Sequence, residues 1–61
     1  MNFPTPNQCR AYVKRRMRQR GLTQKEVARR ARWYQPSLSA WLSGRREIEH
    51  ATMRRVLGAV K

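Results

Sequence analysis

Acidic residues are almost missing from this sequence, which has no aspartate and only three glutamates against fifteen lysines and arginines. The net charge of +12 opposes folding by self-repulsion and favours a polyanionic partner. Few groups remain for acid–base catalysis, and each has a structural explanation close to a helix end. These groups are Glu26, Glu47, Glu49 and His50. We therefore expect a binding protein and not an enzyme.

Cysteine, histidine and long apolar runs are equally scarce. The single Cys9 cannot form an internal disulfide, and together with His50 it falls far short of a metal-ligand set. No apolar run approaches the length of a signal peptide or a membrane span. We expect a protein of the reducing cytoplasm, associated with the nucleoid, without cofactor, metal or small-molecule ligand. Cys9 is expected to be a small core residue.

What the sequence has in abundance is arginine, with twelve residues against three lysines. The guanidinium group bonds two acceptors at once, which suits phosphates and guanine edges. Nucleic acid is therefore the first candidate partner. The rival partner is an acidic membrane, because the first basic amphipathic segment taken alone is typical of a membrane-active peptide. Such a peptide needs no helix caps, so the capping signals described below favour a folded domain over it.

The chain is predicted to divide into an arm over residues 1–6 and one domain over residues 7–61. Two prolines keep the arm from being helical throughout, and its Phe3 is a candidate to fold onto the domain. A first helix is predicted from one apolar stripe, and it ends at Gly21, which suits a left-handed cap. The stripe consists of Cys9, Tyr12, Val13 and Met17.

Two short helices follow, joined by a connection of only about three residues. Thr23 and Glu26 form a capping-box pattern at the start of the first, which is predicted over residues 24–31. The next helix is predicted over residues 35–43, because a proline in its first turn and a glycine after its last residue mark the two ends. Two short helices joined so tightly must cross at a steep angle.

A last helix is predicted to start near residues 49–51, with apolar residues at positions 53, 56, 57 and 60 in a helical repeat. The glutamates near its amino end favour the helix dipole. The expected fold class is all-α, a compact domain of four to five helices. The predicted core consists of Val13, Met17, Leu22, Val27, Ala28, Leu38, Trp41, Ile48, Val56 and Leu57.

The segment over residues 35–43 carries no charged side chain, although 30% of the residues in the chain are charged. Leu38, Trp41 and Leu42 share one side of the predicted helix, and the other side has only glutamine, proline, serine and alanine. An ordinary surface helix carries long charged side chains there. Short side chains allow close approach to base edges, where glutamine pairs with adenine, serine with several edges and alanine with a thymine methyl.

From about Val13 to Val60 the chain resembles the Cro and lambda-repressor family of helix-turn-helix domains. In that family a glutamine opens the second helix, an alanine four residues later packs against the third, and the third ends in a tryptophan-containing run and a glycine. The matching residues here are Gln24, Ala28, Leu38, Trp41 and Gly44. The resemblance implies a lambda-repressor-like fold with a central motif over about residues 23–44. The family usually has glycine where this chain has Arg32, and a left-handed arginine there costs roughly 1–2 kcal/mol.

The same resemblance implies roles for individual residues. Base edges would be read by Gln35, Pro36, Ser39 and Ala40. The DNA backbone would be bound by Gln24, Ser43, Arg45 and Arg46. Tyr34 departs from the small polar residue usual in the family, and we expect it to contact the DNA backbone, with packing on the domain as the alternative. The implied function is a Cro-like or repressor-like transcriptional regulator that binds specific double-stranded DNA in the major groove, as a homodimer on a palindromic operator and without a membrane partner. The alternative is a basic protein with little sequence preference that compacts DNA or binds RNA.

Overall fold

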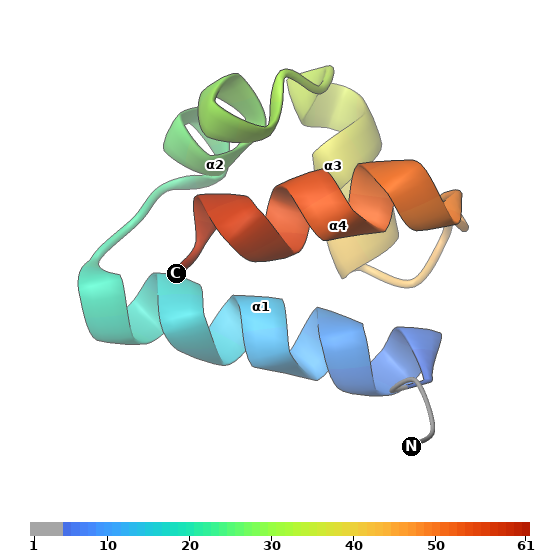
Figure 1. The fold of residues 1–61 in the computed structure, drawn as a ribbon, viewed down its shortest axis with the longest axis horizontal. Coiled ribbons are helices and arrows are strands. Elements are labelled where there is room, and N and C mark those ends of the chain that lie inside the picture. Colours follow the sequence, from blue (N-terminus) through green and yellow to red (C-terminus); the bar gives the residue numbers. More distant parts are fainter. Residues whose placement is uncertain (1–4) are drawn as a thin grey trace.

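The computed structural model describes residues 5–61, which form four helices and no strand (Figure 1). They are α1 (Pro6–Arg20), α2 (Gln24–Ala31), α3 (Gln35–Leu42) and α4 (His50–Ala59). The expected all-α fold is confirmed for this part of the chain. No helix within it is long and apolar enough to cross a bilayer. The expected contact of Phe3 with the domain lies outside the described residues.

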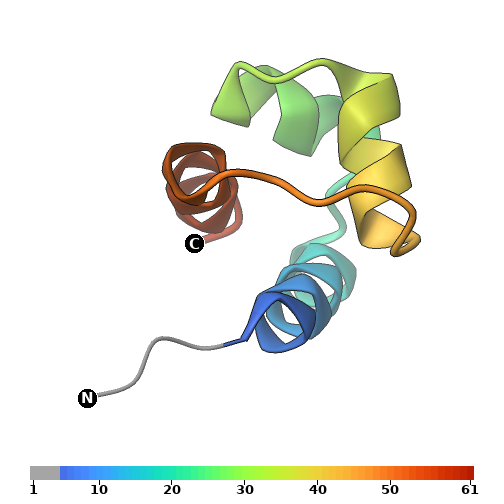
Figure 2. The ribbon, with the colours of Figure 1, turned by 90° about the vertical axis from the view of Figure 1, so that its right-hand side faces the viewer.

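The helices are arranged so that α1 and α2 each pack against both α3 and α4. In Figure 1, α4 runs between α1 and α2. Figure 2 shows α3 at one edge of the molecule, with α4 on the other side. Within residues 5–61, α1 does not pack against α2, and α3 does not pack against α4. One side of α3 therefore faces the core, and its other side is left open.

The buried core agrees with most of the predicted positions. Six of them are buried, and four are half-buried and pack against the core. The six are Val13, Val27, Ala28, Leu38, Trp41 and Val56, and the four are Met17, Leu22, Ile48 and Leu57. Cys9 is buried, as expected for a small core residue. Tyr12, which the apolar stripe placed inside, is 39% exposed, because α1 buries only the narrower line of Cys9 and Val13.

The first helix begins one residue inside the predicted arm. Pro6 is its first residue, which suits proline because the amide at that position has no intrahelical partner. Thr5 and Gln8 form a reciprocal capping box around it. The Gln8 amide donates to Thr5 Oγ1 at 3.1 Å, and the Thr5 amide donates to Gln8 Oε1 at 2.8 Å. Pro6 thus marks a helix start that sequence patterning had placed after residue 6.

The capping box expected at α2 is only half formed. Thr23 Oγ1 accepts a hydrogen bond from the Glu26 amide at 3.1 Å. The Glu26 carboxylate does not return to Thr23 within the described chain, because it pairs with Arg29 at 2.8 Å and Arg30 at 3.2 Å. The hydrogen bond from Arg29 is the largest cause that lowers the pKa of Glu26 below its ordinary 4.5. The pairing therefore stabilises the fold above that pH, and its contribution is lost as pH falls through the lowered pKa.

The carboxyl ends of α1, α2 and α3 each form a Schellman motif. In this turn a left-handed residue is followed by a residue whose amide donates a hydrogen bond back to a carbonyl in the last turn of the helix. The bonds run from Leu22 to Met17, from Trp33 to Ala28 and from Arg45 to Ala40, each at 2.9 Å. The left-handed residues are Gly21, Arg32 and Gly44, with φ of 64°, 54° and 85°. Glycine adopts this conformation at no steric cost, whereas Arg32 has a Cβ that opposes it. The departure from glycine noted in the sequence thus leaves the turn itself intact.

Arg32→Gly should stabilise the fold by about 1 kcal/mol, because relief of roughly 1–2 kcal/mol of left-handed strain exceeds the entropy that glycine adds to the unfolded chain. In a domain this small, thermal circular dichroism should show a melting temperature raised by about 4–8 °C. Arg32→Ala is the matched control, since it removes the same charge and keeps a Cβ on the left-handed backbone. An Arg32→Ala protein as stable as Arg32→Gly would show that the backbone is unstrained.

Five arginines stabilise the fold by donating to backbone carbonyls of other segments. The pairs are Arg10 with Trp41, Arg16 with Val60, Arg20 with Lys61, Arg30 with Ala59 and Arg55 with Ala31. Every acceptor lies in the last turn of a helix or just past it, where carbonyls lack intrahelical partners and the helix dipole favours positive charge. From the sequence alone, the arginine excess is attributed to a polyanionic partner. Part of that excess therefore stabilises the fold instead.

Candidate nucleic-acid interface

The position of α3 is fixed through its apolar side. Leu38, Trp41 and Leu42 are buried. Arg10 of α1 reaches across to Trp41, where its Nε donates to the carbonyl at 2.5 Å and its guanidinium carbon lies 5.6 Å from the centroid of the indole ring. Hydrogen bond and cation–π contact together tie α1 to the carboxyl-terminal half of α3. Sequence reasoning missed Arg10, because no local pattern links residues 31 positions apart.

The opposite side of α3 carries the four residues predicted to read bases. Gln35 and Pro36 are exposed, and Ser39 and Ala40 are half-buried. No charged side chain occurs in α3, and none of the four makes a side-chain hydrogen bond to any residue from 5 to 61. The structure therefore brings these four onto one helix surface, which we call the bare face. Its short side chains are of the kinds that bond or contact base edges.

The amino-terminal end of α3 presents polar groups to solvent. Tyr34 is the N-cap residue, makes no side-chain capping bond and is 71% exposed. The first turn of a helix has amides without intrahelical partners and carries the positive end of the helix dipole. An uncapped end of this kind suits a phosphate oxygen. The exposed position of Tyr34 is compatible with its predicted contact to the DNA backbone.

The carboxyl-terminal end of α3 carries three of the predicted backbone contacts. Ser43 Oγ donates to the Ala40 carbonyl at 3.0 Å and accepts from Arg45 Nε at 3.0 Å. The hydroxyl hydrogen is thus used inside the turn, and Ser43 orients the Arg45 guanidinium. Arg46 is exposed, in the segment between α3 and α4. Two guanidinium groups therefore follow the bare face directly.

The last predicted contact, Gln24, comes from a different helix. It is the first residue of α2, directly after the Thr23 cap, and it is half-buried. Its side chain makes no hydrogen bond with the described part of α3. Gln24 is therefore placed at a helix amino end, as a phosphate contact requires, but no contact joins it to the bare face.

A family model described as helix-turn-helix matches residues 13–59. The matched segment contains all of α2, α3 and α4 and covers well over half of the chain. No significant match was found among curated proteins or among solved structures.

Proposed function

The chain belongs to the helix-turn-helix family of the Cro and lambda-repressor type, and on that premise we propose that it is a sequence-specific regulator of transcription. Double-stranded DNA is the ligand that the family implies. In the proposed complex α3 lies in the major groove, and its bare face reads base edges. Gln24, Tyr34, Arg45 and Arg46 hold the sugar–phosphate backbone on either side, and Ser43 contributes by orienting the Arg45 guanidinium. The nucleoid is then the place of action.

The single observation that carries the proposal is the bare face of α3. In a chain with net charge +12, this helix has no lysine or arginine on its exposed side. A helix face exposed only to water has no need to exclude long charged side chains. A helix face that enters a DNA groove needs short side chains to approach the base edges. Because the apolar side of α3 is buried against the body, the bare face is held outward in one orientation.

Replacement of Arg45 or Arg46 by alanine should weaken binding to all duplexes to a similar extent, because both are proposed to bind phosphates. Each phosphate contact contributes about −0.9 to the slope of log affinity against log salt, so each variant should reduce that slope by about one unit. Fluorescence anisotropy over a range of salt concentrations measures it. Arg15→Ala is the control, since Arg15 is exposed on α1 without a hydrogen bond. An unchanged slope in both variants would show that neither arginine contacts the DNA phosphates.

We propose further that two copies bind one operator, because a single domain reads too few base pairs to find its site among genomic DNA. Selection from randomised duplexes tests this. Enrichment of a palindrome is expected, with half-sites about one helical turn, or roughly 34–36 Å, apart. Enrichment of one isolated half-site would support sequence-specific binding but contradict the proposal that two copies bind one operator. No enrichment would overturn the proposal in favour of a basic protein with little sequence preference, which the net charge supports equally.

A further inference from the structure

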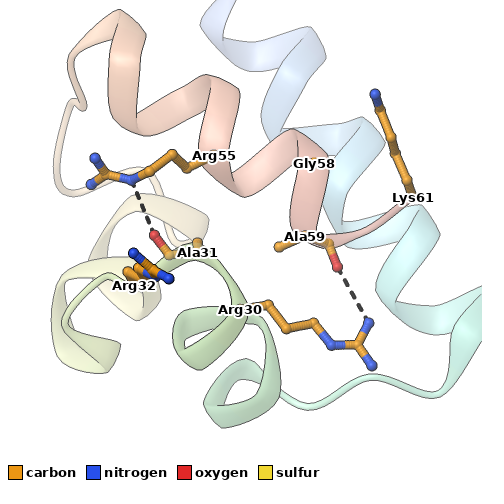
Figure 3. A pocket seen from close by; sticks show the side chains of 7 residues that line it. All are labelled: Arg30, Ala31, Arg32, Arg55, Gly58, Ala59 and Lys61. Carbon is orange, nitrogen blue, oxygen red and sulfur yellow. Dashed lines mark hydrogen bonds between the residues drawn. The ribbon is translucent and has the colours of Figure 1, made fainter.

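A basic pocket lies between α2 and α4 and shares no residue with the proposed DNA contacts (Figure 3). Its volume is about 430 Å³, within the range of pockets that hold small ligands. It is lined by Arg30, Arg32, Arg55 and Lys61 together with the small residues Ala31, Gly58 and Ala59, and the Lys61 side chain extends away from the three arginines (Figure 3). No acidic side chain of residues 5–61 lines it. The pocket therefore concentrates positive charge over a floor with little side-chain bulk.

The pocket offers hydrogen-bond donors. Arg55 Nε donates to the Ala31 carbonyl at 3.1 Å, and Arg30 Nη1 donates to the Ala59 carbonyl at 3.5 Å. These bonds engage both carbonyls and hold the two guanidinium groups at the pocket wall (Figure 3). Arg30 also donates to Glu26 at 3.2 Å, which partly neutralises it. Arg55 keeps its Nη donors for a ligand.

Arg32 gives a second, independent observation. It is held left-handed, whereas the other two turns of this kind have glycine. Its side chain lines the pocket and makes no hydrogen bond within the described chain. Arg32 follows Ala31, whose carbonyl accepts from Arg55 Nε, and both arginines line the pocket, where their like charges disfavour one another unless an anion binds. The left-handed backbone forms the turn that ends α2, but glycine would form the same turn without strain, so the turn does not explain the arginine side chain.

We propose that this pocket binds a phosphate-bearing anion, with Arg32 and Arg55 as its main ligands. Each guanidinium can donate two parallel N–H bonds to phosphate oxygens. No aromatic side chain of residues 5–61 lines the pocket, so a nucleobase has nothing to stack on, and the phosphate group itself is recognised. A free polyphosphate and a nucleic-acid backbone both carry this group, and the two sources are separated by experiment.

The first titration adds inorganic pyrophosphate to the nitrogen-15-labelled full chain and follows its amide resonances. A saturable shift at Gly58 and Arg32 is expected, with a dissociation constant raised roughly tenfold or more in Arg32→Gly and in Arg55→Gln. Arg32→Gly relieves backbone strain, so weaker binding by that variant is not a loss of folding. Arg15→Gln is the matched control, which removes an exposed charge of the same kind from α1 and should bind as wild type does.

The second titration adds a DNA duplex to the same variants. Weaker duplex binding by Arg32→Gly and Arg55→Gln than by Arg15→Gln identifies backbone phosphate as a ligand. Unchanged duplex binding with weaker pyrophosphate binding identifies a free polyphosphate instead. If both pocket variants bind both probes as strongly as Arg15→Gln, the pocket is not an anion site. Gln35→Ala leaves the pocket intact, so failure of base reading and failure of the pocket are distinguishable.

Discussion

Trp41→Ala should remove most of the stability of the domain. The indole is fully buried, and truncation of a buried tryptophan costs about 3–5 kcal/mol. At about 0.05–0.15 kcal/mol per residue, a chain of this length has roughly 3–9 kcal/mol in total. The Arg10 guanidinium would also lose the ring that it covers. Circular dichroism should show reduced helicity and the loss of a cooperative thermal transition above room temperature.

Two further variants make the test of Trp41 specific. Trp33→Ala removes the same side chain from a half-buried position, so it should retain helicity and a cooperative transition. Trp41→Phe should cost far less than Trp41→Ala, because the buried Nε1 of Trp41 has no partner in the described chain and an unmet donor costs about 1–3 kcal/mol. Wild-type helicity and melting in Trp41→Ala would show that the indole is not part of the core.

Gln35→Ala should weaken binding to the preferred site by about 1–3 kcal/mol and hardly change binding to unrelated duplex. Gln35 is exposed at the first position of α3, and its side-chain amide makes no hydrogen bond within residues 5–61. It is therefore available to form two bonds with an adenine. Unrelated duplex is bound through phosphates, which the substitution leaves untouched. Anisotropy titrations with both duplexes measure the difference.

The control for Gln35 is Gln19→Ala, which truncates an exposed glutamine on α1 whose Oε1 accepts one long hydrogen bond, from Arg16 at 3.4 Å. It should leave both affinities unchanged. Alanine is a better helix former than glutamine, so neither variant should lose folding. Wild type and Gln35→Ala could instead select the same sequences from a randomised duplex pool with equal affinity. That result would contradict the proposal that α3 reads bases, and it would favour a basic protein with little sequence preference.

The elements that sequence predicts best are those whose ends are marked by local chemistry. The prediction of residues 24–31 for α2 agrees with the structure at both ends. A threonine cap starts that helix, and a proline in the first turn and a following glycine bracket α3 over residues 35–42. The bare face was predictable for the same reason, because helical periodicity alone separates Leu38, Trp41 and Leu42 from their neighbours.

What sequence could not predict depends on partners that are distant in the chain. The arginine-to-carbonyl bonds join residues 24 to 44 positions apart, and no local pattern marks them. The pocket of Arg32 and Arg55 exists only once the ends of α2 and α4 meet. Glu26 fitted a capping box by spacing, but its carboxylate meets two arginines on its own helix that compete with the backbone amide. Local sequence patterns thus predict the fold class. They do not predict which arginines bind carbonyls of the fold and which remain available for a ligand.

The packing of the helices also determines how the chain can reach its fold. Every interhelical contact joins α1 or α2 to α3 or α4. A nascent chain that ends at Ala31 therefore has two helices with nothing to pack against, and one of them has only eight residues. Helices shorter than about 12–15 residues are marginal in water without such packing. The amino-terminal half therefore lacks tertiary packing until α3 and α4 have been synthesised, and we expect the domain to form in one cooperative step.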